Sequence, residues 1–349
     1  MSRPFDPNRI PRREFLRRTA GSAAALATAG LTLQVASRTA GAAPISLTFV
    51  TPFGFLVGYA PTLVAKAGGY FEKEGLDVTI YGGRGAAMAV QQVLSGQALL
   101  SRTGGVDLIK AVANAKAPLV SIGVIDQGSP FHVVSKVGKE IRNPKDMVGK
   151  TIGIISQGGA VENLLDIMLV NSGIDPKSVP RQVVGNSPGA FGLIEQGRID
   201  CYIISVGSVV ALRLAKQPIH SWNTDEHAPI PGQVYVTSRE DAEKQPETMV
   251  KFLRALLHSI AAITADKDFK QTFDLMKGFE ISEMKDLKVA TEALKAELEL
   301  WDEAGASNRL RHIPEKWQTG VDLMAKAGMI PAGTAEVYYT NSFIDKARA

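Results

Sequence analysis

Hydrophobic positions along the chain recur in one order: a short alternating strand, a turn of small residues, and a helical stripe. In the first copy, residues 45–50 alternate as a strand and Thr51–Phe55 break the pattern. A helix is predicted from about Tyr59, with Pro61 tolerated in its first turn. The chain therefore opens with a strand–turn–helix unit.

Further copies of this unit follow, and two of their helical stripes end at Gly96 and Gly173, as helices commonly end at glycine. Their turns lie at residues 82–85, 101–105, 156–159, 186–189 and 205–208. Strands that alternate with helices in this way are typical of parallel sheets covered by helices. The pattern predicts an α/β fold with mostly parallel sheets.

Two interruptions divide the α/β part, at Asp126–Pro130 and at Trp222–Gly232, which holds two prolines. After about residue 238 the apolar spacing becomes helical to the end of the chain. With 349 residues there is enough chain for two domains. We expect a two-lobed molecule with a helical tail. The expected boundaries are 43–128 for the first part of lobe I, 129–222 for lobe II, and 223–349 for the return to lobe I with the C-terminal helices.

The basic character of the chain belongs to its N-terminus. The formal net charge is +4, but residues 1–42 hold seven arginines and two acidic residues, which makes +5. The remaining chain has 32 basic and 33 acidic residues, or −1. Bulk charge therefore gives no reason to expect a nucleic-acid partner.

Residues 1–42 resemble an export signal. Arg12-Arg13 precedes Phe15-Leu16, an Ala-rich run follows, and Ala40-Gly41-Ala42 suits a signal peptidase. This arrangement predicts a twin-arginine signal, with an ordinary Sec signal or an uncleaved amphipathic anchor as alternatives. No cysteine follows the apolar run, which excludes a lipoprotein. We expect a soluble periplasmic protein in which no later stretch is long and apolar enough to span a membrane.

Ligands of open α/β sheets bind beyond the carboxyl ends of the strands, where the turns into helices lie. Glycine and serine there let backbone N–H groups approach a ligand closely. Arg84 and Arg102 lie inside two of these turns and could pair with a carboxylate, sulfonate or phosphate. A single turn of this kind would more often only relieve crowding, with its arginine in solvent. The repeated pattern favours one ligand-binding cleft.

Signals of catalysis, metal binding or a cofactor are weak. The only cysteine, Cys201, lies among apolar strand residues and cannot form an internal disulfide. Gly83-x-Gly85-x-x-Met88 lacks the third glycine of a dinucleotide fingerprint, and residues 220–227 lack metal-ligand spacing. No arrangement of Ser, His and Asp, and no pair of carboxylates, indicates a catalytic site. We expect a protein that is not an enzyme and has no metal and no cofactor.

Four segments in the same order resemble a known family. Residues 67–78, AGGYFEKEGLDV, resemble the GYF-x-x-EGLDV signature of ABC-transporter substrate-binding proteins in the nitrate, sulfonate, taurine and thiamine-precursor group. Residues 146–153, 169–176 and 194–200 resemble that group's further short motifs, and the similarity spans about residues 45–210. The resemblance implies a two-lobed, type II-like periplasmic binding fold that closes on a ligand about a hinge.

The resemblance also places ligand contacts on the turns found from periodicity. The implied residues are Phe53, Phe55, Arg84, Gly85, Ala86, Arg102, Thr103, Gly104, Ser156, Gly158, Gly159, Ala160, Asn186 and Ser205. Two arginines beside aromatic residues favour a small organic anion, either a sulfonate or an aromatic carboxylate. Replacing either arginine by alanine is then expected to cost about 1.5–3 kcal/mol of binding free energy.

The leading hypothesis is a monomeric binding protein that delivers a small molecule to a membrane-embedded ABC permease with its ATPase. Three alternatives stay open. One is a thiamine-precursor-type binding protein. The second is an enzyme on the same scaffold, since relatives include pyrimidine-synthesising catalysts with a lysine-bound pyridoxal cofactor. The third is a sensor partner that presents its ligand to a membrane receptor.

Overall fold

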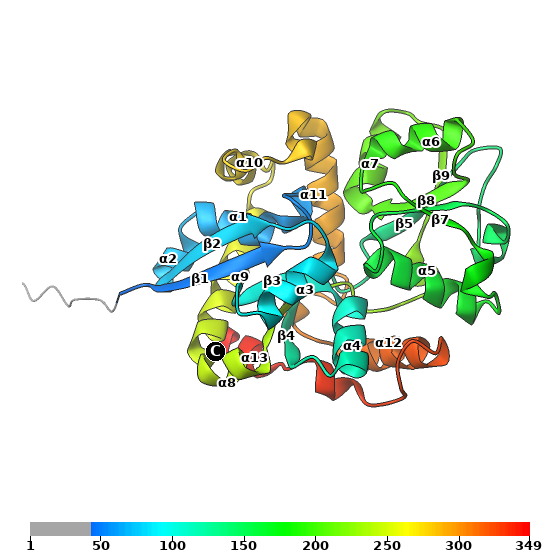
Figure 1. Cartoon of the computed structure of the whole chain (residues 1–349). Helices are drawn as coiled ribbons and strands as arrows, with labels where there is room; N and C mark the ends of the chain where they lie inside the picture. The colour runs from blue at the N-terminus through cyan, green and yellow to red at the C-terminus, as the bar shows by residue number, and fades with distance from the viewer. Residues whose placement is uncertain (1–42) are drawn as a thin grey trace, which may run out of the picture. The chain divides into compact units, whose positions relative to one another are not determined.

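The computed structural model of the chain describes residues 43–349 (Figure 1). The predicted export signal, residues 1–42, lies outside the described residues. Within 43–349 the strands form two separate five-stranded sheets. Helices pack around each sheet, which confirms the predicted α/β class.

The first sheet has the strand order β2-β1-β3-β10-β4. Strand β1 runs parallel to both β2 and β3, whereas β10 is antiparallel to β3 and to β4. Helices α1 to α4 belong to this part of the chain. The bounds are β1 Ile45–Thr51, α1 Ala60–Ala67, α2 Tyr70–Lys73, β2 Leu76–Gly82, α3 Ala86–Leu94, β3 Leu100–Gly104, α4 Gly105–Ala115, β4 Leu119–Val124 and β10 Gln233–Ser238.

The second sheet repeats this plan with the order β7-β6-β8-β5-β9. Strand β6 is parallel to β7 and β8, and β5 is antiparallel to β8 and β9. The bounds are β5 Phe131–Lys136, β6 Ile152–Ile154, α5 Ala160–Asn171, β7 Arg181–Val183, α6 Phe191–Glu195, β8 Cys201–Ser205, α7 Val206–Leu214 and β9 Ile219–Asn223. Cys201 is fully buried in this sheet.

The chain passes between the sheets twice, from β4 to β5 and from β9 to β10. Strand β10 lies between β3 and β4 in the first sheet, and β5 lies between β8 and β9 in the second, so each sheet has two antiparallel pairings beside its two parallel ones. The sheets are therefore mixed, which refines the mostly parallel sheets expected from the alternation of strands and helices.

Six helices follow β10, and three of them pack on strands of the first sheet. Their bounds are α8 Arg239–Lys244, α9 Pro246–Ala265, α10 Lys270–Met276, α11 Leu287–Trp301, α12 Pro314–Lys326 and α13 Ser342–Arg348. Two contacts reach the other half: α11 packs against α7, side by side in Figure 1, and α12 touches α5. Asp286 begins α11 by accepting hydrogen bonds from the first backbone N–H groups of the helix.

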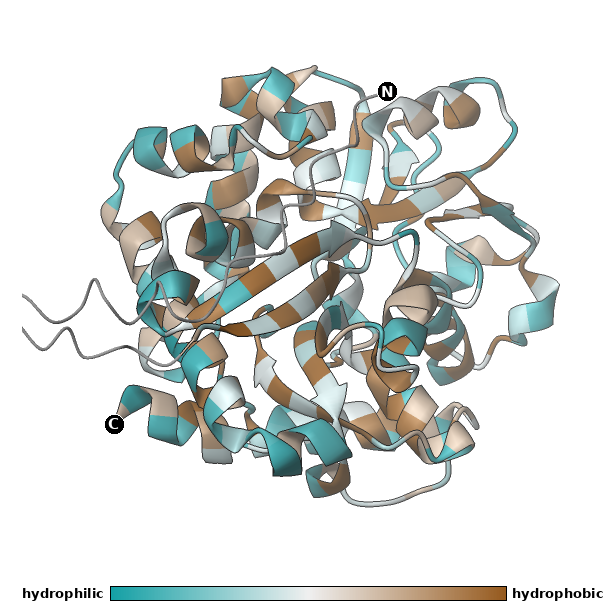
Figure 2. Cartoon of the chain, turned by 60° about the vertical axis from the view of Figure 1, so that its left-hand side comes forward, coloured by the Kyte–Doolittle hydropathy of each residue, from teal (hydrophilic) through white to brown (hydrophobic). Residues whose placement is uncertain are grey.

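Helix α9 supplies much of the core beside the first sheet. Phe252 stacks on Phe49 and Phe71, with ring centroids 5.7 and 5.3 Å away. Helix α9 has 20 residues, and an 18-residue window of it has a mean hydropathy of 1.3, so by length and composition it could cross a membrane. This corrects the expectation that no stretch after the export signal is long and apolar enough to do so. Because Phe252 and Leu256 are fully buried, α9 is a core helix. Hydrophobic and hydrophilic residues alternate along the helices in Figure 2, as expected for helices that bury one face.

Candidate ligand-binding pocket

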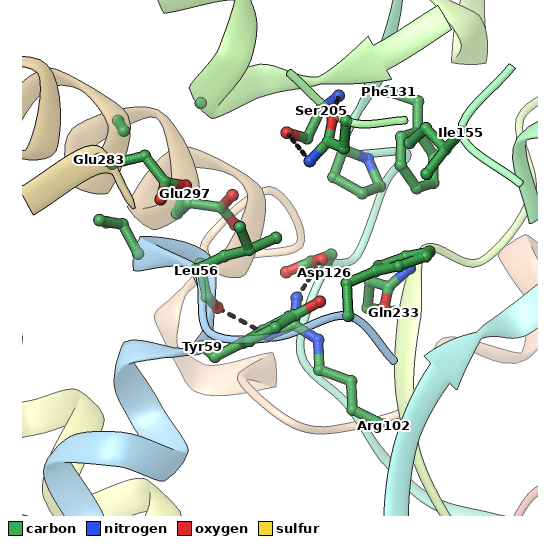
Figure 3. Close-up of a pocket in the computed structure, with 17 residues that line it drawn as sticks. Leu56, Tyr59, Arg102, Asp126, Phe131, Ile155, Ser205, Gln233, Glu283 and Glu297 are labelled. Carbon is green, nitrogen blue, oxygen red and sulfur yellow. Dashed lines mark hydrogen bonds and ion pairs between the residues drawn. The ribbon is translucent and has the colours of Figure 1, made fainter. Parts of the chain in front are cut away.

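A pocket lies between the two sheets and is lined by 17 residues (Figure 3). It holds about 510 Å³ of empty space, including the part open to solvent. Tyr59 and Arg102 line it from the first sheet's side, and Phe131 and Ser205 from the second. Glu283 and Glu297, from the C-terminal segment, lie together on a third side.

Arg102, on β3, is buried and already paired. Its Nη2 donates to Asp126 Oδ2 at 2.7 Å, and its Nη1 donates to the carbonyl of Gly58 at 2.7 Å. The guanidinium also lies over the ring of Tyr59, 4.8 Å from the centroid. Burial opposes its charge, but Asp126 and other neighbours outweigh burial and raise the pKa of Arg102. Its positive charge is therefore neutralised inside the protein.

Glu297, on α11, has a carboxyl group with unused hydrogen-bonding capacity. The residue is 6% exposed, and its Oε2 atom has no hydrogen-bond partner among the described residues. Burial raises the pKa of Glu297 to about 8; Asp126 adds to the rise and Arg102 opposes it. Burial also raises the pKa of Glu283, in the short 3₁₀ turn Ser282–Lys285. An unoccupied pocket at neutral pH therefore holds Glu297 mostly as the neutral acid.

The second sheet contributes an uncharged wall. The Asn186 side chain donates to Ser205 Oγ at 2.9 Å and accepts from the Ser205 backbone N–H at 3.0 Å. Phe131, at the start of β5, lies opposite Ser205 in the antiparallel ladder. Ile155 completes this face. The two hydrogen bonds fix the loop after β7 to the end of β8, where the sequence placed a ligand-binding turn.

The structure gathers four of the predicted ligand residues in this pocket: Phe53, Arg102, Asn186 and Ser205. Gly104 and Ala160 line a smaller neighbouring pocket. The other predicted residues do not line the main pocket. They are Phe55, Arg84, Gly85, Ala86, Thr103, Ser156, Gly158 and Gly159.

The structure places the side chains of Arg84 and Phe55 outside the main pocket. Arg84 is exposed, and its backbone pairs with that of Phe53 in an isolated β-bridge. Phe55 packs edge-on against Phe279, with ring centroids 5.3 Å apart. The sequence correctly placed both residues in the turns after strands, but position in a turn does not determine the direction of a side chain.

Sequence reasoning missed Tyr59, Asp126, Glu283 and Glu297, which carry most of the pocket's polar chemistry. For Glu297 a signal was available. It lies three residues after Leu294 and four before Trp301, on the buried stripe of α11. A carboxylate at a core position of an amphipathic helix is unusual unless it is paired or functional.

The charges of the pocket do not favour the predicted organic anion. Among its 17 described lining residues, Arg102 is the sole basic side chain, against Asp126, Glu283 and Glu297. Arg84 does not line the pocket, and Arg102 is paired with Asp126, so neither of the two arginines offers a free positive charge to a solute here. None of these lining residues is a lysine, so the pocket offers no amine for a bound pyridoxal. Over residues 43–349 no group of three His, Cys, Asp or Glu residues is placed to hold a metal ion.

A polar contact joins α4 to α5 beside the smaller pocket. Asn163 donates to Asp107 Oδ1 at 3.0 Å and accepts from the Lys110 ammonium at 2.8 Å. Burial raises the pKa of Asp107 to about 7, although the Asn163 hydrogen bond opposes the rise. The helix that follows β3 is thereby linked to the helix that follows β6.

The model of the family described as NMT1/THI5 like matches residues 57–268. The chain belongs to the NMT1/THI5-like family. This match covers most of both sheets and the whole of α9, and it agrees with the resemblance found from the four short motifs.

Two curated relatives of this NMT1/THI5-like chain align over most of their length. One is the 4-amino-5-hydroxymethyl-2-methylpyrimidine phosphate synthase of Schizosaccharomyces pombe, 22% identical over 82% of each chain. The other is the riboflavin-binding protein RibY of Chloroflexus aurantiacus, 24% identical over 82% of this chain and 83% of the relative.

Solved structures of low identity share the fold. A protein of Bordetella bronchiseptica RB50 superposes with a TM-score of 0.72 at 19% identity, covering 87% of this chain and 96% of that one. The alkanesulfonate-binding protein SsuA of Xanthomonas axonopodis pv. citri, bound to MOPS, gives a TM-score of 0.63 at 16% identity, covering 86% and 100%. The chain has the periplasmic binding protein fold.

Proposed function

We propose that this protein captures a small organic solute between its two sheets and delivers it to an ABC permease. One observation carries the proposal: the pocket lies between sheets that two chain crossings connect, and its wall includes a buried carboxyl atom with no hydrogen-bond partner within residues 43–349. Two bodies joined by two crossings can open and close about a hinge. A pocket at their junction is the usual place for a small ligand.

The proposal includes two lobes, of which lobe I comprises residues 43–128 and 223–349 and lobe II comprises residues 129–222. The proposal includes export to the periplasm by the twin-arginine route and a monomeric mature protein. The N-terminal sequence supports export, and the fold shared with periplasmic binding proteins supports partnership with a permease and its ATPase.

The solute is proposed to be flat and partly apolar. The rings of Phe53, Tyr59 and Phe131 line the pocket, and aromatic faces favour planar ligands. The curated relatives are named for riboflavin binding and for pyrimidine phosphate synthesis, which supports a nitrogen heterocycle over a simple anion. Within this proposal Phe53, Asn186 and Ser205 contact the solute, and Arg102 keeps Asp126 in place.

The test is to purify the full-length expressed protein without denaturation and to identify released small molecules by mass spectrometry. The released compound is then titrated into protein refolded without it. We expect binding at one molecule per chain, a rise in thermal stability, and recovery of the compound unchanged. Conversion of the compound on incubation would instead support the enzyme alternative suggested by the synthase relative. Binding without any effect on uptake when the permease is present would support a sensor.

A further inference from the structure

We infer that the pocket selects a solute bearing a positively charged nitrogen group, such as an amine, an amidine or a protonated ring nitrogen, which binds the carboxyl group of Glu297. This inference rests on the proposed function and names the chemical class of its solute.

The charges around the pocket support a cation. The ion pair between Arg102 and Asp126, 2.7 Å long, neutralises one carboxylate and the sole arginine of the described lining. Glu283 and Glu297 remain, and no basic side chain of that lining is left to pair with them. Of the two, Glu297 is the more deeply buried, and a buried carboxyl group without a partner is costly unless a ligand supplies one.

The backbone around Glu297 leaves room for its carboxyl group. A Cβ atom at Gly58 would lie 2.6 Å from Glu297 Oε1, so only glycine at this position accommodates the present side-chain position. The Gly58 carbonyl also accepts the hydrogen bond from Arg102. One residue therefore places the neutralised arginine and the unpartnered glutamate next to each other.

Aromatic rings complete a site suited to an organic cation. Tyr59 already lies against the guanidinium of Arg102, and Phe53 and Phe131 line the same cavity. Ring faces attract cations, and the interaction strengthens where water is excluded. An anion in the pocket would lie beside the same rings and beside two carboxyl groups. No unpaired basic side chain of the described lining would attract it.

Cation binding is expected to expel a proton from Glu297. The groups facing Glu297 are Asp126, Arg102, Glu283 and the phenol of Tyr59. Because the pKa of Glu297 is about 8 without ligand, the residue must lose its proton to pair with a cation at pH 7. Affinity for a cation should rise about tenfold per pH unit up to about pH 8 and level off above it.

The experiment uses calorimetric titration of the full-length protein with four probes of similar size: benzamidinium, benzamide, benzoate and benzenesulfonate. We expect benzamidinium to bind at least about tenfold more tightly than either anion, as for a charge-assisted hydrogen bond. Its binding should release close to one proton at pH 7, measured by repeating the titration in buffers of different ionisation enthalpy.

Glu297→Gln should remove both the preference for benzamidinium and the proton release. Glu299→Gln, an exposed position on the same helix, is the matched control and should retain both. Thermal unfolding checks that each variant folds, and Glu283→Gln provides a second variant, which should weaken benzamidinium binding less than Glu297→Gln.

Equal or tighter binding of benzoate or benzenesulfonate would overturn the inference, as would a benzamidinium preference that survives Glu297→Gln. Failure of all four probes to bind would overturn it too. The proposed function is tested separately by the compound that co-purifies with the protein. A neutral or anionic compound bound in the pocket would contradict the inference of a cationic solute but would still support solute binding as the function.

Discussion

The two sheets share a strand order but give the pocket opposite chemistry. In each, three strands are parallel and a strand that follows a chain crossing adds an antiparallel neighbour. The part built on the first sheet supplies Arg102, Asp126 and the glutamates of the C-terminal segment. The second sheet supplies Phe131, Asn186 and Ser205, none of which is charged.

We propose that the two sides of the pocket have different functions. In this proposal the charged side decides which solutes bind, because its groups are buried and their protonation depends on the solute. The uncharged side contributes hydrogen bonds and apolar contacts, which are less selective for charge. Substitutions should therefore have different consequences on the two sides.

The largest expected effect is that of Arg102→Leu. The substitution leaves Asp126 buried without its partner, and removal of one member of a buried ion pair costs about 3–5 kcal/mol. The free energy of unfolding, measured with urea, should fall by that amount. The double variant Arg102→Leu, Asp126→Leu is the control and should recover much of the loss. A loss below about 1 kcal/mol in the single variant would show that the pair is not buried as described.

Burial of Asp107, at the contact between α4 and α5, should make the free energy of unfolding depend on pH. The pKa of Asp107 is raised from 3.8 to about 7, so the folded state holds a proton that the unfolded state has released. The contribution of Asp107 to the free energy of unfolding is fully present below about pH 3.8 and is lost as the pH rises through about 7. Asp107→Asn should therefore be more stable than wild type at pH 8 by at most about 4 kcal/mol, with the difference vanishing near pH 4. Parallel unfolding curves from pH 4 to 8 measure it, and a constant difference would contradict this assignment.

On the uncharged side, Asn186→Ala should have a moderate effect. It removes two hydrogen bonds to Ser205, and each is worth about 0.5–1.5 kcal/mol. The free energy of unfolding should fall by about 1–3 kcal/mol, while the preference between benzamidinium and benzoate stays unchanged. A lost preference would mean that the second sheet also selects for charge.

The smallest effect is expected for Arg84→Ala. Arg84 is exposed and lies outside the pocket, so stability should change by less than about 0.5 kcal/mol and solute affinity should stay the same. The position of Arg84 in a turn predicted instead a loss of about 1.5–3 kcal/mol of binding free energy. A tenfold loss of solute affinity on calorimetric titration would contradict this expectation and indicate that Arg84 contacts the solute.

Much of the fold could be predicted because periodicity reports which face of an element is buried. The strand at Ile45–Thr51, the helix ended by Gly96 and the helical segment after about residue 238 all lie where the pattern placed them. Strand order could not be read in the same way. Nothing in β10 itself indicates that it returns between β3 and β4, because that pairing joins residues more than 100 positions apart.

The site was harder to predict because charge in a pocket depends on partners distant in sequence. Arg84 and Arg102 looked equivalent, yet Arg102 meets Asp126 from the end of β4 and Arg84 meets solvent. Glu297 comes from a helix nearly 200 residues further along the chain than Arg102. Turns after strands indicate the edge at which a ligand can bind, but only the assembled structure shows which charges remain unpaired there.

The central claim is that the solute binds between the two sheets, and filling that space tests it most directly. A Cβ atom at Gly207, on α7, would lie 3.6 Å from Ala293 and 3.7 Å from the Glu283 carboxyl group, so Gly207→Leu places its side chain in the pocket. Gly192→Leu, on α6, is the matched control because a Cβ atom there meets nothing within 4 Å. Both variants are titrated calorimetrically with the compound that co-purifies with wild type. We predict that Gly192→Leu binds like wild type and Gly207→Leu binds at least about a hundredfold more weakly, a loss of about 2.7 kcal/mol. Wild-type affinity in a folded Gly207→Leu variant would contradict the claim and place the solute elsewhere.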